Sequence, residues 1–330
     1  MRFGGRLAMP RMHSLLLAIA TSAIALAAPA AAQDYPDRPV RVIVPFPPGG
    51  VNDIVGRMIA TQLSERLGKQ FVVENRTGAA SIVGSEIAAN APKDGYTLLV
   101  VSIVNAVNPW LYKLPYDPKT AFVPIAFLAQ APTVLVVNPT LPVNSIKELL
   151  ALAKGKPGEV LYASAGVGSF MHLGGELFKL TAGIDLMHVP FRGGGPAMID
   201  LVAGNTKVGF ATTITTSPFI KSGKLKGLGV GALKRSAVLP ELPTVAEAGV
   251  PDYEVANWIG MVAPAGTPKD IIDKLNKEIA AIQASPEGQK LLAARGAEAV
   301  NMSPAEFGAF MTREMAKWER VVREGKIKRE

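Results

Sequence analysis

The strongest constraint on the fold is an alternation of short β-branched runs with amphipathic, helix-like stretches. Residues 39–45, PVRVIVP, are apolar on both faces, which is typical of a buried parallel strand. A helical pattern over residues 51–67 stops at Gly68, and the strand-like runs FVVEN and YTLLVV follow with another helical stretch between them. This order predicts an α/β unit with a parallel sheet and right-handed crossovers.

The same design restarts after Pro142. Ser145 can cap a helix, and the strand-like runs EVLYAS, LMHVP and KVGFAT follow with helical stretches between them. The C-terminal part adds the run GMVAPAGTP and amphipathic helices, one of which opens with a capping box of Ser303 and Glu306. The apolar stripe of that helix is expected to pack in the core: Phe307, Phe310, Met311, Trp318 and Val321.

These two units predict two α/β lobes. The C-terminal helices need a sheet to cover, and the first unit is the natural host. The chain then crosses between the lobes near residues 128–135 and again near residues 250–256. We therefore expect lobe 1 to comprise residues 33–131 and 254–330, and lobe 2 to comprise residues 132–253.

The first 32 residues have the pattern of a cleaved secretory signal peptide. A basic start without acidic residues precedes an apolar stretch over residues 15–28, and Ala30 and Ala32 have the A-x-A spacing of a cleavage site. The apolar stretch is too short for a stable membrane span, and no cysteine adjoins the expected new N-terminus at Gln33, so no lipid anchor is implied. The mature chain is predicted to be free in an extracytoplasmic space.

Composition excludes several classes of function. The chain has no cysteine, so disulfides and thiol catalysis are unavailable, and its two histidines outside the predicted signal peptide form no recognisable metal motif. The net charge of +8 falls to +5 without the three arginines of the first 32 residues, and the charges are scattered. Nucleic-acid binding requires a clustered basic face, so we expect none. A mild positive balance helps to attract anions.

Glycine clusters mark three strand-to-helix junctions: FPPGGVND at residues 46–53, SAGVGSFMH at 164–172 and FRGGGPA at 191–197. Open α/β sheets bind ligands at the carboxyl ends of their strands, where helix N-termini offer free N–H donors and partial positive charge. Facing each other across a cleft, the junctions would form a two-sided anion socket. Asp53 either interacts with the helix dipole or accepts a hydrogen bond from a ligand.

Two other interpretations of the second junction are weaker. The run GVGSFM lacks the spacing and the lysine of a phosphate-binding P-loop. Ser169 is not in a G-x-S-x-G elbow, and His172 follows it at capping distance rather than as a catalytic base. His188 lies in the strand-like run LMHVP. We therefore favour Ser169 as a helix cap and ligand donor over Ser169 as a nucleophile.

Taken together, eight segments resemble the Bug receptors of tripartite tricarboxylate transporters over almost all of residues 35–326. The segments are RPVRVIVPFPPGGVND, VVENRTGA, DGYTLL, NPWLY, LPYDP, YASAGVGSFMHLGGE, HVPFRGGGPA and APAGTP. The resemblance implies a periplasmic solute-binding protein with a type II-like two-lobed α/β fold and a ligand cleft between the lobes. It also implies small carboxylate ligands, which include di- and tricarboxylates, acidic amino acids and aromatic acids.

In that family the loop after the first strand and the Gly/Ser turn of the second lobe grip the carboxylate, partly through ordered water. The candidate ligand-binding residues are therefore Phe46, Pro47, Pro48, Gly49, Gly50, Asp53, Ser164, Gly166, Gly168, Ser169, Arg192, Gly193 and Gly194. The sequence departs from the family with Thr77 and Ala80, where Pro and Gly are usual. It departs again with Phe191 and Arg192, where Tyr and Lys are common. Arg192 offers a planar fork of donors, whereas a lysine would offer a point charge.

The sequence thus predicts a non-enzymatic periplasmic receptor that closes around a small organic carboxylate. Its expected partners are the ligand and membrane permease subunits, with no cofactor, no metal and no nucleic acid, and the receptor is expected to be a monomer. Two alternatives stay open: an exported hydrolase or isomerase that uses the same cleft, and a ligand sensor for a membrane kinase.

Overall fold

The computed structural model describes residues 1–5, 35–236, 239–294 and 296–328. The predicted cleavage site and nearly all of the predicted signal peptide therefore lie outside the described residues. Met1–Asp37 forms a unit of its own, and its described residues contain no helix or strand. The fold below is that of the second unit, Arg38–Glu330.

Strands and helices alternate along this unit. The strands are β1 (Val40–Val44), β2 (Phe71–Asn75), β3 (Thr97–Ser102), β4 (Phe122–Val137), β5 (Leu161–Ser164), β6 (Met187–Pro190), β7 (Val208–Thr212), β8 (Lys226–Val230) and β9 (Ala256–Pro264). The helices are α2 (Val51–Leu67), α3 (Ile82–Ala89), α4 (Ile103–Leu111), α5 (Ile146–Gly155), α6 (Phe170–Ala182), α7 (Gly194–Ala203), α8 (Thr213–Lys221), α9 (Lys269–Ala284), α10 (Pro286–Ala293) and α11 (Pro304–Glu324). In the described part of the chain, no helix has the length and apolar character that crossing a membrane requires.

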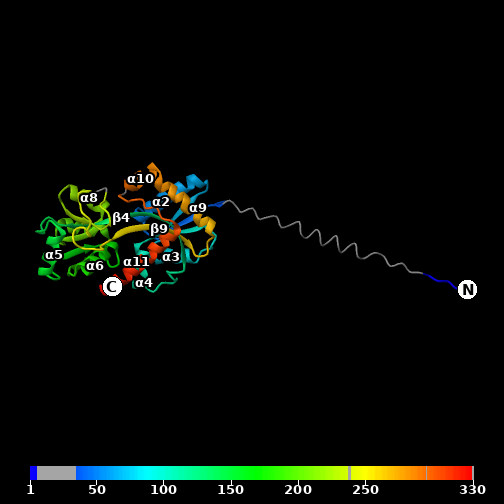
Figure 1. Ribbon diagram of the computed structural model, residues 1–330, viewed down its shortest axis with the longest axis horizontal. Coiled ribbons are helices and arrows are strands. Elements are labelled where there is room, and N and C mark those ends of the chain that lie inside the picture. The colour runs from blue at the N-terminus through cyan, green and yellow to red at the C-terminus, as the bar shows by residue number, and fades with distance from the viewer. Residues whose placement is uncertain (6–34, 237–238, 295, 329–330) are drawn as a thin grey trace. The chain divides into compact units, whose positions relative to one another are not determined.

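The first half of the sheet has the order β2-β1-β3-β9-β4. β1 lies parallel to both β2 and β3, as the first three strand-like runs predicted, whereas β9 runs antiparallel to β3 and β4. Figure 1 shows α2, α9 and α10 on one side of this half and α3, α4 and α11 on the other. Burial on both faces explains why β3, and β1 apart from Arg41, are largely apolar, whereas the edge strand β2 also contains Glu74 and Asn75.

The second half of the sheet contains β7, β5 and β6, with β8 beside β4. β5 is parallel to β6 and β7, while β7 and β8 pair antiparallel with the last residues of β4. The carboxyl end of β5 leads into α6 and that of β6 into α7. Both glycine-rich junctions of this half therefore open at the same edge of the sheet.

The strand β4 joins the two halves. It pairs with β9 up to Pro132 and with β7 from Thr133 onward. The segment before β9 runs beside it, because Val255 accepts hydrogen bonds from the Thr133 N–H and hydroxyl and donates one to Gly231. Figure 1 shows β4 and β9 running between the helices of the first half and the helices α5, α6 and α8 of the second half. The lobe boundaries given above stay a prediction.

The C-terminal helix α11 packs along the first half as its apolar stripe predicted. Ser303 and Glu306 form the predicted capping box. Phe307 and Trp318 are fully buried, and Phe307 stands edge-on to Phe127 of β4 at 5.9 Å between ring centroids. Burial of these rings supplies much of the apolar area that joins the helix to the sheet.

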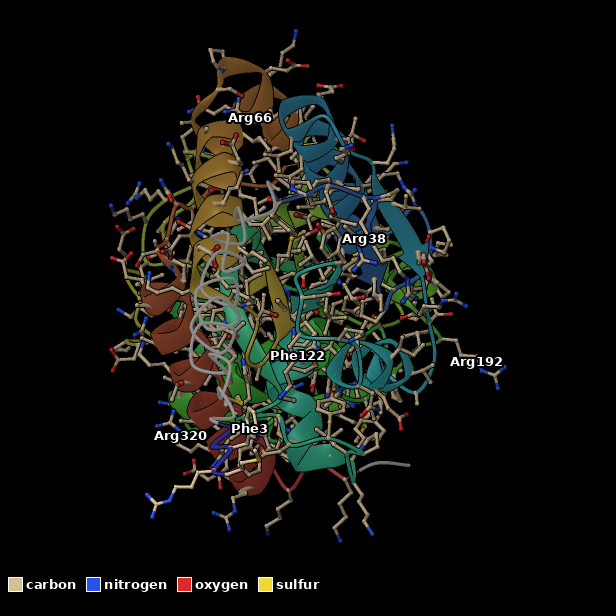
Figure 2. All side chains as sticks on the ribbon, turned by 90° about the vertical axis from the view of Figure 1, so that its right-hand side faces the viewer. Phe3, Arg38, Arg66, Phe122, Arg192 and Arg320 are labelled. Atoms are coloured by element: carbon tan, nitrogen blue, oxygen red, sulfur yellow. The ribbon has the colours of Figure 1, made fainter. Side chains whose placement is uncertain are left out.

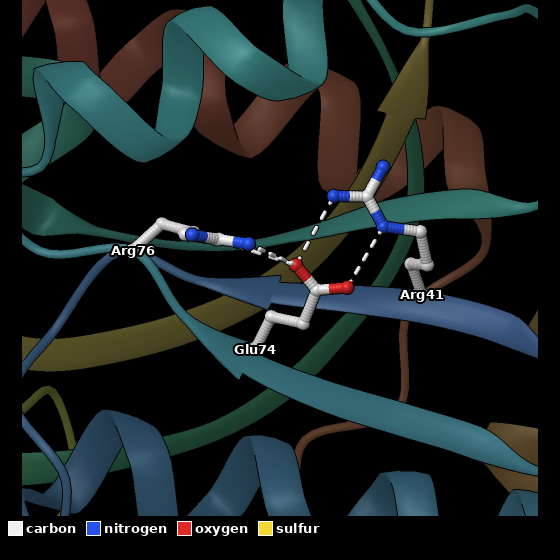
Figure 3. A network of polar contacts seen from close by, with 3 residues as sticks. All are labelled: Arg41, Glu74 and Arg76. Atoms are coloured by element: carbon white, nitrogen blue, oxygen red, sulfur yellow. Dashed lines mark hydrogen bonds and ion pairs between the residues drawn. The ribbon is translucent and has the colours of Figure 1, made fainter.

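An ion cluster lies at the β2 edge of the sheet. Glu74 lies between two arginines in Figure 3, accepting from Arg41 Nε at 2.8 Å and from Arg76 Nη2 at 3.0 Å. The hydrogen bond from Arg41 outweighs partial burial and, together with Arg76, lowers the pKa of Glu74 to about 2. Glu74 therefore stays ionised and offsets part of the positive charge of the two arginines.

Candidate functional site

The loop between β1 and α2 is anchored by a buried carboxylate. Asp53, in the first turn of α2, accepts hydrogen bonds from the Gly49 N–H (2.9 Å), Arg57 (2.8 Å) and Asn75 (2.8 Å). Asn75 also donates to the Phe46 carbonyl at 3.1 Å. Burial raises the pKa of Asp53, but these hydrogen bonds outweigh it and the pKa lies below its ordinary value. Asp53 thus holds the shape of the loop, because both of its oxygens already have partners.

The turn between β5 and α6 is built on two left-handed glycines, Gly166 (φ +112°) and Gly168 (φ +77°). A Cβ on Gly168 would also lie 3.0 Å from Leu111 Cδ1. A side chain there would therefore be strained both by the backbone conformation and by this close contact. Ser169 caps α6, as predicted, by accepting the His172 N–H at 3.3 Å. The turn therefore brings a tight backbone and a serine hydroxyl to the edge of the sheet.

Two donors of this turn are used within the protein. The Gly166 N–H donates to Ser164 Oγ at 3.1 Å, and the Gly168 N–H donates to His172 Nδ1 at 3.1 Å. The sequence predicts that backbone N–H groups of this turn face a ligand, whereas these two are bonded within the protein. Among the hydrogen bonds of the described residues, none uses the N–H of Val167, which lies between these two glycines. Within residues 166–169, the backbone N–H without a partner among the described residues is that of Val167.

Beneath the turn, three aromatic rings form a stack. His172 stacks on His188 with ring centroids 4.0 Å apart, and His188 stacks on Tyr162 at 4.9 Å. Burial is the largest cause that lowers the pKa of His172 to about 3 and of His188 to about 4, and the positive charge of Lys179 adds to it. Both imidazoles are consequently neutral near pH 7.

A cavity of about 350 Å³ lies between the two loops. It brings together Phe46 and Pro47 from the first loop with Gly168 and Ser169 from the second, which are four of the predicted site residues. The rest of its lining is Pro45, Thr77, Gly78, Ala79, Ala80, Ser81, Val104 and Val167. We call this space the first cavity. Residues from both halves of the sheet enclose it, as a ligand site between two lobes requires.

A second cavity of about 350 Å³ shares Val167 with the first. It contains the predicted residues Gly166 and Arg192. The rest of its lining is Leu111, Tyr112, Val167, Pro190 and Phe191. The Arg192 side chain is exposed, and Figure 2 shows it directed away from the ribbon, so it stands at the rim of this second cavity.

The other predicted residues line neither cavity. They are Pro48, Gly49, Gly50, Asp53, Ser164, Gly193 and Gly194. Gly50 and Gly193 precede the first residues of α2 and α7, where they act as N-caps without a side chain. Asp53 and Ser164 support the two loops from inside. Sequence reasoning had grouped these supporting residues with the residues that enclose the space.

Several lining residues were missed at the sequence level. Leu111 and Tyr112 end α4, and they belong to the segment NPWLY, which had signalled only the family resemblance. The loop of Thr77–Ser81 contains three successive left-handed residues, Ala79, Ala80 and Ser81. Asn108 of α4 holds this loop by donating to the Ala80 carbonyl at 2.7 Å. The signal available for the loop was its departure from the family pattern at Thr77 and Ala80.

The contacts of Ser169 do not match those of an activated nucleophile. Its hydroxyl accepts the His172 backbone N–H, while the His172 ring nitrogen is engaged by Gly168. A closer serine–imidazole contact joins Ser164 Oγ and His188 Nε2 at 2.6 Å, but Ser164 is fully buried and lines neither cavity. In the described part of the chain, no three His, Asp or Glu side chains gather as metal ligands would.

This architecture, with strands shared between two α/β halves and a cavity where their loops meet, is that of a periplasmic solute-binding protein. The family described as "Tripartite tricarboxylate transporter family receptor" matches residues 55–327. BugT of Bordetella pertussis is 38% identical over 309 residues, which cover 93% of this chain and 94% of BugT. The chain belongs to the tripartite tricarboxylate transporter receptor family, whose members are receptors and not enzymes.

Solved structures agree with this assignment. R. palustris Rpa4515 with adipate has a TM-score of 0.77 at 36% identity, covering 89% of this chain and 99% of that one. MatC from Rhodopseudomonas palustris with bound malate has a TM-score of 0.73 at 31% identity, covering 87% and 100%. The resemblance expected from the eight sequence segments is confirmed.

Proposed function

We propose that this receptor captures a small organic carboxylate in the first cavity and delivers it to membrane permease subunits. The observation that carries the proposal is the meeting of the Phe46–Pro47 loop with the Gly168–Ser169 turn around one space. The relatives with adipate and with malate support a dicarboxylate in particular. The mature protein is proposed to be a periplasmic monomer that begins near Gln33, which N-terminal sequencing of the exported form tests.

Arg192 is proposed to contact a second anionic group of the ligand. It stands at the rim of the second cavity, which adjoins the first through Val167. A ligand held by one carboxylate at the Gly168–Ser169 turn would extend past Val167 toward this guanidinium. The planar fork of Arg can bind a carboxylate in bidentate fashion, which favours dianionic over monoanionic ligands.

The test is a thermal and calorimetric titration of refolded, ligand-stripped mature protein with adipate, malate and a panel of other carboxylates. A ligand present at 100 times its dissociation constant should stabilise the protein by about 2.7 kcal/mol through mass action. Adipamide, which has the length of adipate without its charges, is the matched control and should give no shift. Absence of a shift with every carboxylate, or an equal shift with adipamide, would contradict the proposal.

A further inference from the structure

The Gly166–Ser169 turn is held from beneath by side chains that line neither cavity. The Gly166 N–H is bound by Ser164 Oγ and the Gly168 N–H by His172 Nδ1, each at 3.1 Å. Ser164 is fully buried and His172 is 4% exposed. Both acceptors are therefore internal, and a ligand does not compete for these two donors.

The position of His172 is itself fixed. Its ring lies against His188, whose Nε2 contacts Ser164 Oγ at 2.6 Å and whose other face lies against Tyr162. The Tyr162 hydroxyl donates to Glu176 Oε1 at 2.7 Å, and Lys179 donates to the same oxygen at 3.0 Å. Stacking on His188, whose own Nε2 is held by Ser164, leaves little freedom for the His172 ring to rotate, so its acceptor is preorganised.

Fixing the peptides on both sides of Val167 fixes the Val167 peptide between them. Val167 lines both cavities, and its N–H takes part in no hydrogen bond among those of the described residues. A backbone N–H that lacks an internal partner at a ligand cavity is a donor for an anion. The orientation of this donor depends on where Gly166 and Gly168 are held.

We propose that His172 is a positioning residue for ligand binding: it holds the Gly168 N–H inward and thereby aims the Val167 N–H at a ligand carboxylate. This role rests on the carboxylate-binding function proposed above. It requires an unprotonated Nδ1, and so a neutral His172 that carries its proton on Nε2. Ser164 acts in the same way on the other side of Val167.

The test compares two substitutions of His172 at pH 7. In His172→Asn the amide oxygen stands close to the place of Nδ1 and still accepts the Gly168 N–H, whereas His172→Leu removes the acceptor. Leaving a buried N–H unsatisfied should weaken adipate or malate binding by roughly fivefold to a hundredfold in the Leu variant, and Asn should recover most of this loss. Calorimetric titration measures both.

Thr206→Val is the matched control for a lost buried hydrogen bond. Thr206 is 2% exposed and donates to Asp200 at 2.7 Å, between α7 and β7 and far along the chain from the turn. It should lower the melting temperature without changing affinity for the dicarboxylates. A purely structural role of His172 predicts the same behaviour for His172→Leu, and that result would overturn the proposal.

A second measurement needs no ligand. In the ligand-free wild type, nitrogen-15 NMR should show His172 neutral with its proton on Nε2, and the Gly168 amide should exchange slowly with solvent. Exchange at Gly168 should accelerate in His172→Leu but not in His172→Asn. A proton on Nδ1, or rapid Gly168 exchange in the wild type, refutes the positioning role even where the Leu variant fails to fold. A wild type that binds neither adipate nor malate refutes the proposed ligand class instead, and NMR still decides the role of His172.

Discussion

Acidification from pH 7 to pH 5 should destabilise this protein through its stacked histidines. His172 is buried against His188, and its pKa is lowered from 6.5 to about 3, first by burial and then by the charges of His188 and Lys179. His188 from β6 stacks on it, and the charge of Lys179 from α6 acts on it. Tyr162 from β5 stacks on His188, and its hydroxyl donates to Glu176 of α6, which also accepts from Lys179. Glu176 is already engaged by Tyr162 and Lys179, so it offers no free carboxylate to a protonated imidazole.

The sign follows from the two pKa values. Because the pKa is lower in the folded state, the unfolded chain binds more protons between about pH 6.5 and about pH 3. The stabilisation is complete above pH 6.5 and is lost as the pH falls toward the folded value. With about 1.4 kcal/mol per proton and pH unit, His172 should remove about 2 kcal/mol from the free energy of unfolding between pH 7 and pH 5.

Urea denaturation at pH 7 and pH 5 measures this loss. His172→Asn removes the titrating group and keeps a hydrogen-bond acceptor for Gly168, so its free energy of unfolding should fall by about 2 kcal/mol less than that of the wild type. Carboxylates that titrate in this range act in both proteins and cancel in the comparison. An equal fall in the two proteins would show that His172 is charged when folded, or is not buried as described.

Three further predictions concern the loops. Gly168→Val should leave a folded protein but largely abolish the thermal shift with adipate, because a branched side chain is strained at φ +77° and meets Leu111. Ser169→Ala should cost only about 0.5–2 kcal/mol of stability and keep most of the thermal shift. Arg192→Ala should weaken dianionic ligands more than monoanionic ones in calorimetric titrations, and equal effects would remove its proposed role. Ala80→Gly should raise the free energy of unfolding by up to about 1 kcal/mol, because Ala80 is left-handed at φ +53°, whereas the control Ala88→Gly, within α3, should lower it.

The regular elements of the fold were readable because their signals are local. The parallel strands β1, β2 and β3 showed as apolar or β-branched runs, and the caps at Ser145, Ser169 and Ser303 showed as single residues at helix starts. The strand β4 was predicted only as a crossing point. Its sixteen residues contain two prolines and change partners at Pro132, so neither its length nor its continuity has a local signal. The short strand β8 and the helices α4 and α8 were not predicted either.

In the candidate site, too, the residues with a local signal were predicted and those that depend on tertiary packing were not. The glycine-rich loops were found because left-handed backbone at Gly166 and Gly168 has a residue-level signature. Leu111 and Tyr112 were missed because their place beside Val167 depends on how α4 packs against the rest of the chain. Asp53 was placed correctly in the first turn of its helix. Its partner Asn75 comes from a neighbouring strand 22 residues away, and no spacing rule reveals that contact.

The three-residue spacing of Ser169 and His172 shows how far a local signal reaches. It indicated a helix cap, and the His172 N–H does donate to Ser169 Oγ. The imidazole of the same residue also turns back to accept the Gly168 N–H, and this contact is fixed by a stack that depends on the pairing of Tyr162 with His188 in adjacent strands. The helix start was therefore predictable from residues 169–172 alone. The direction of the backbone N–H donors in the turn depends on sheet register, and this direction decides whether they can bind a ligand carboxylate.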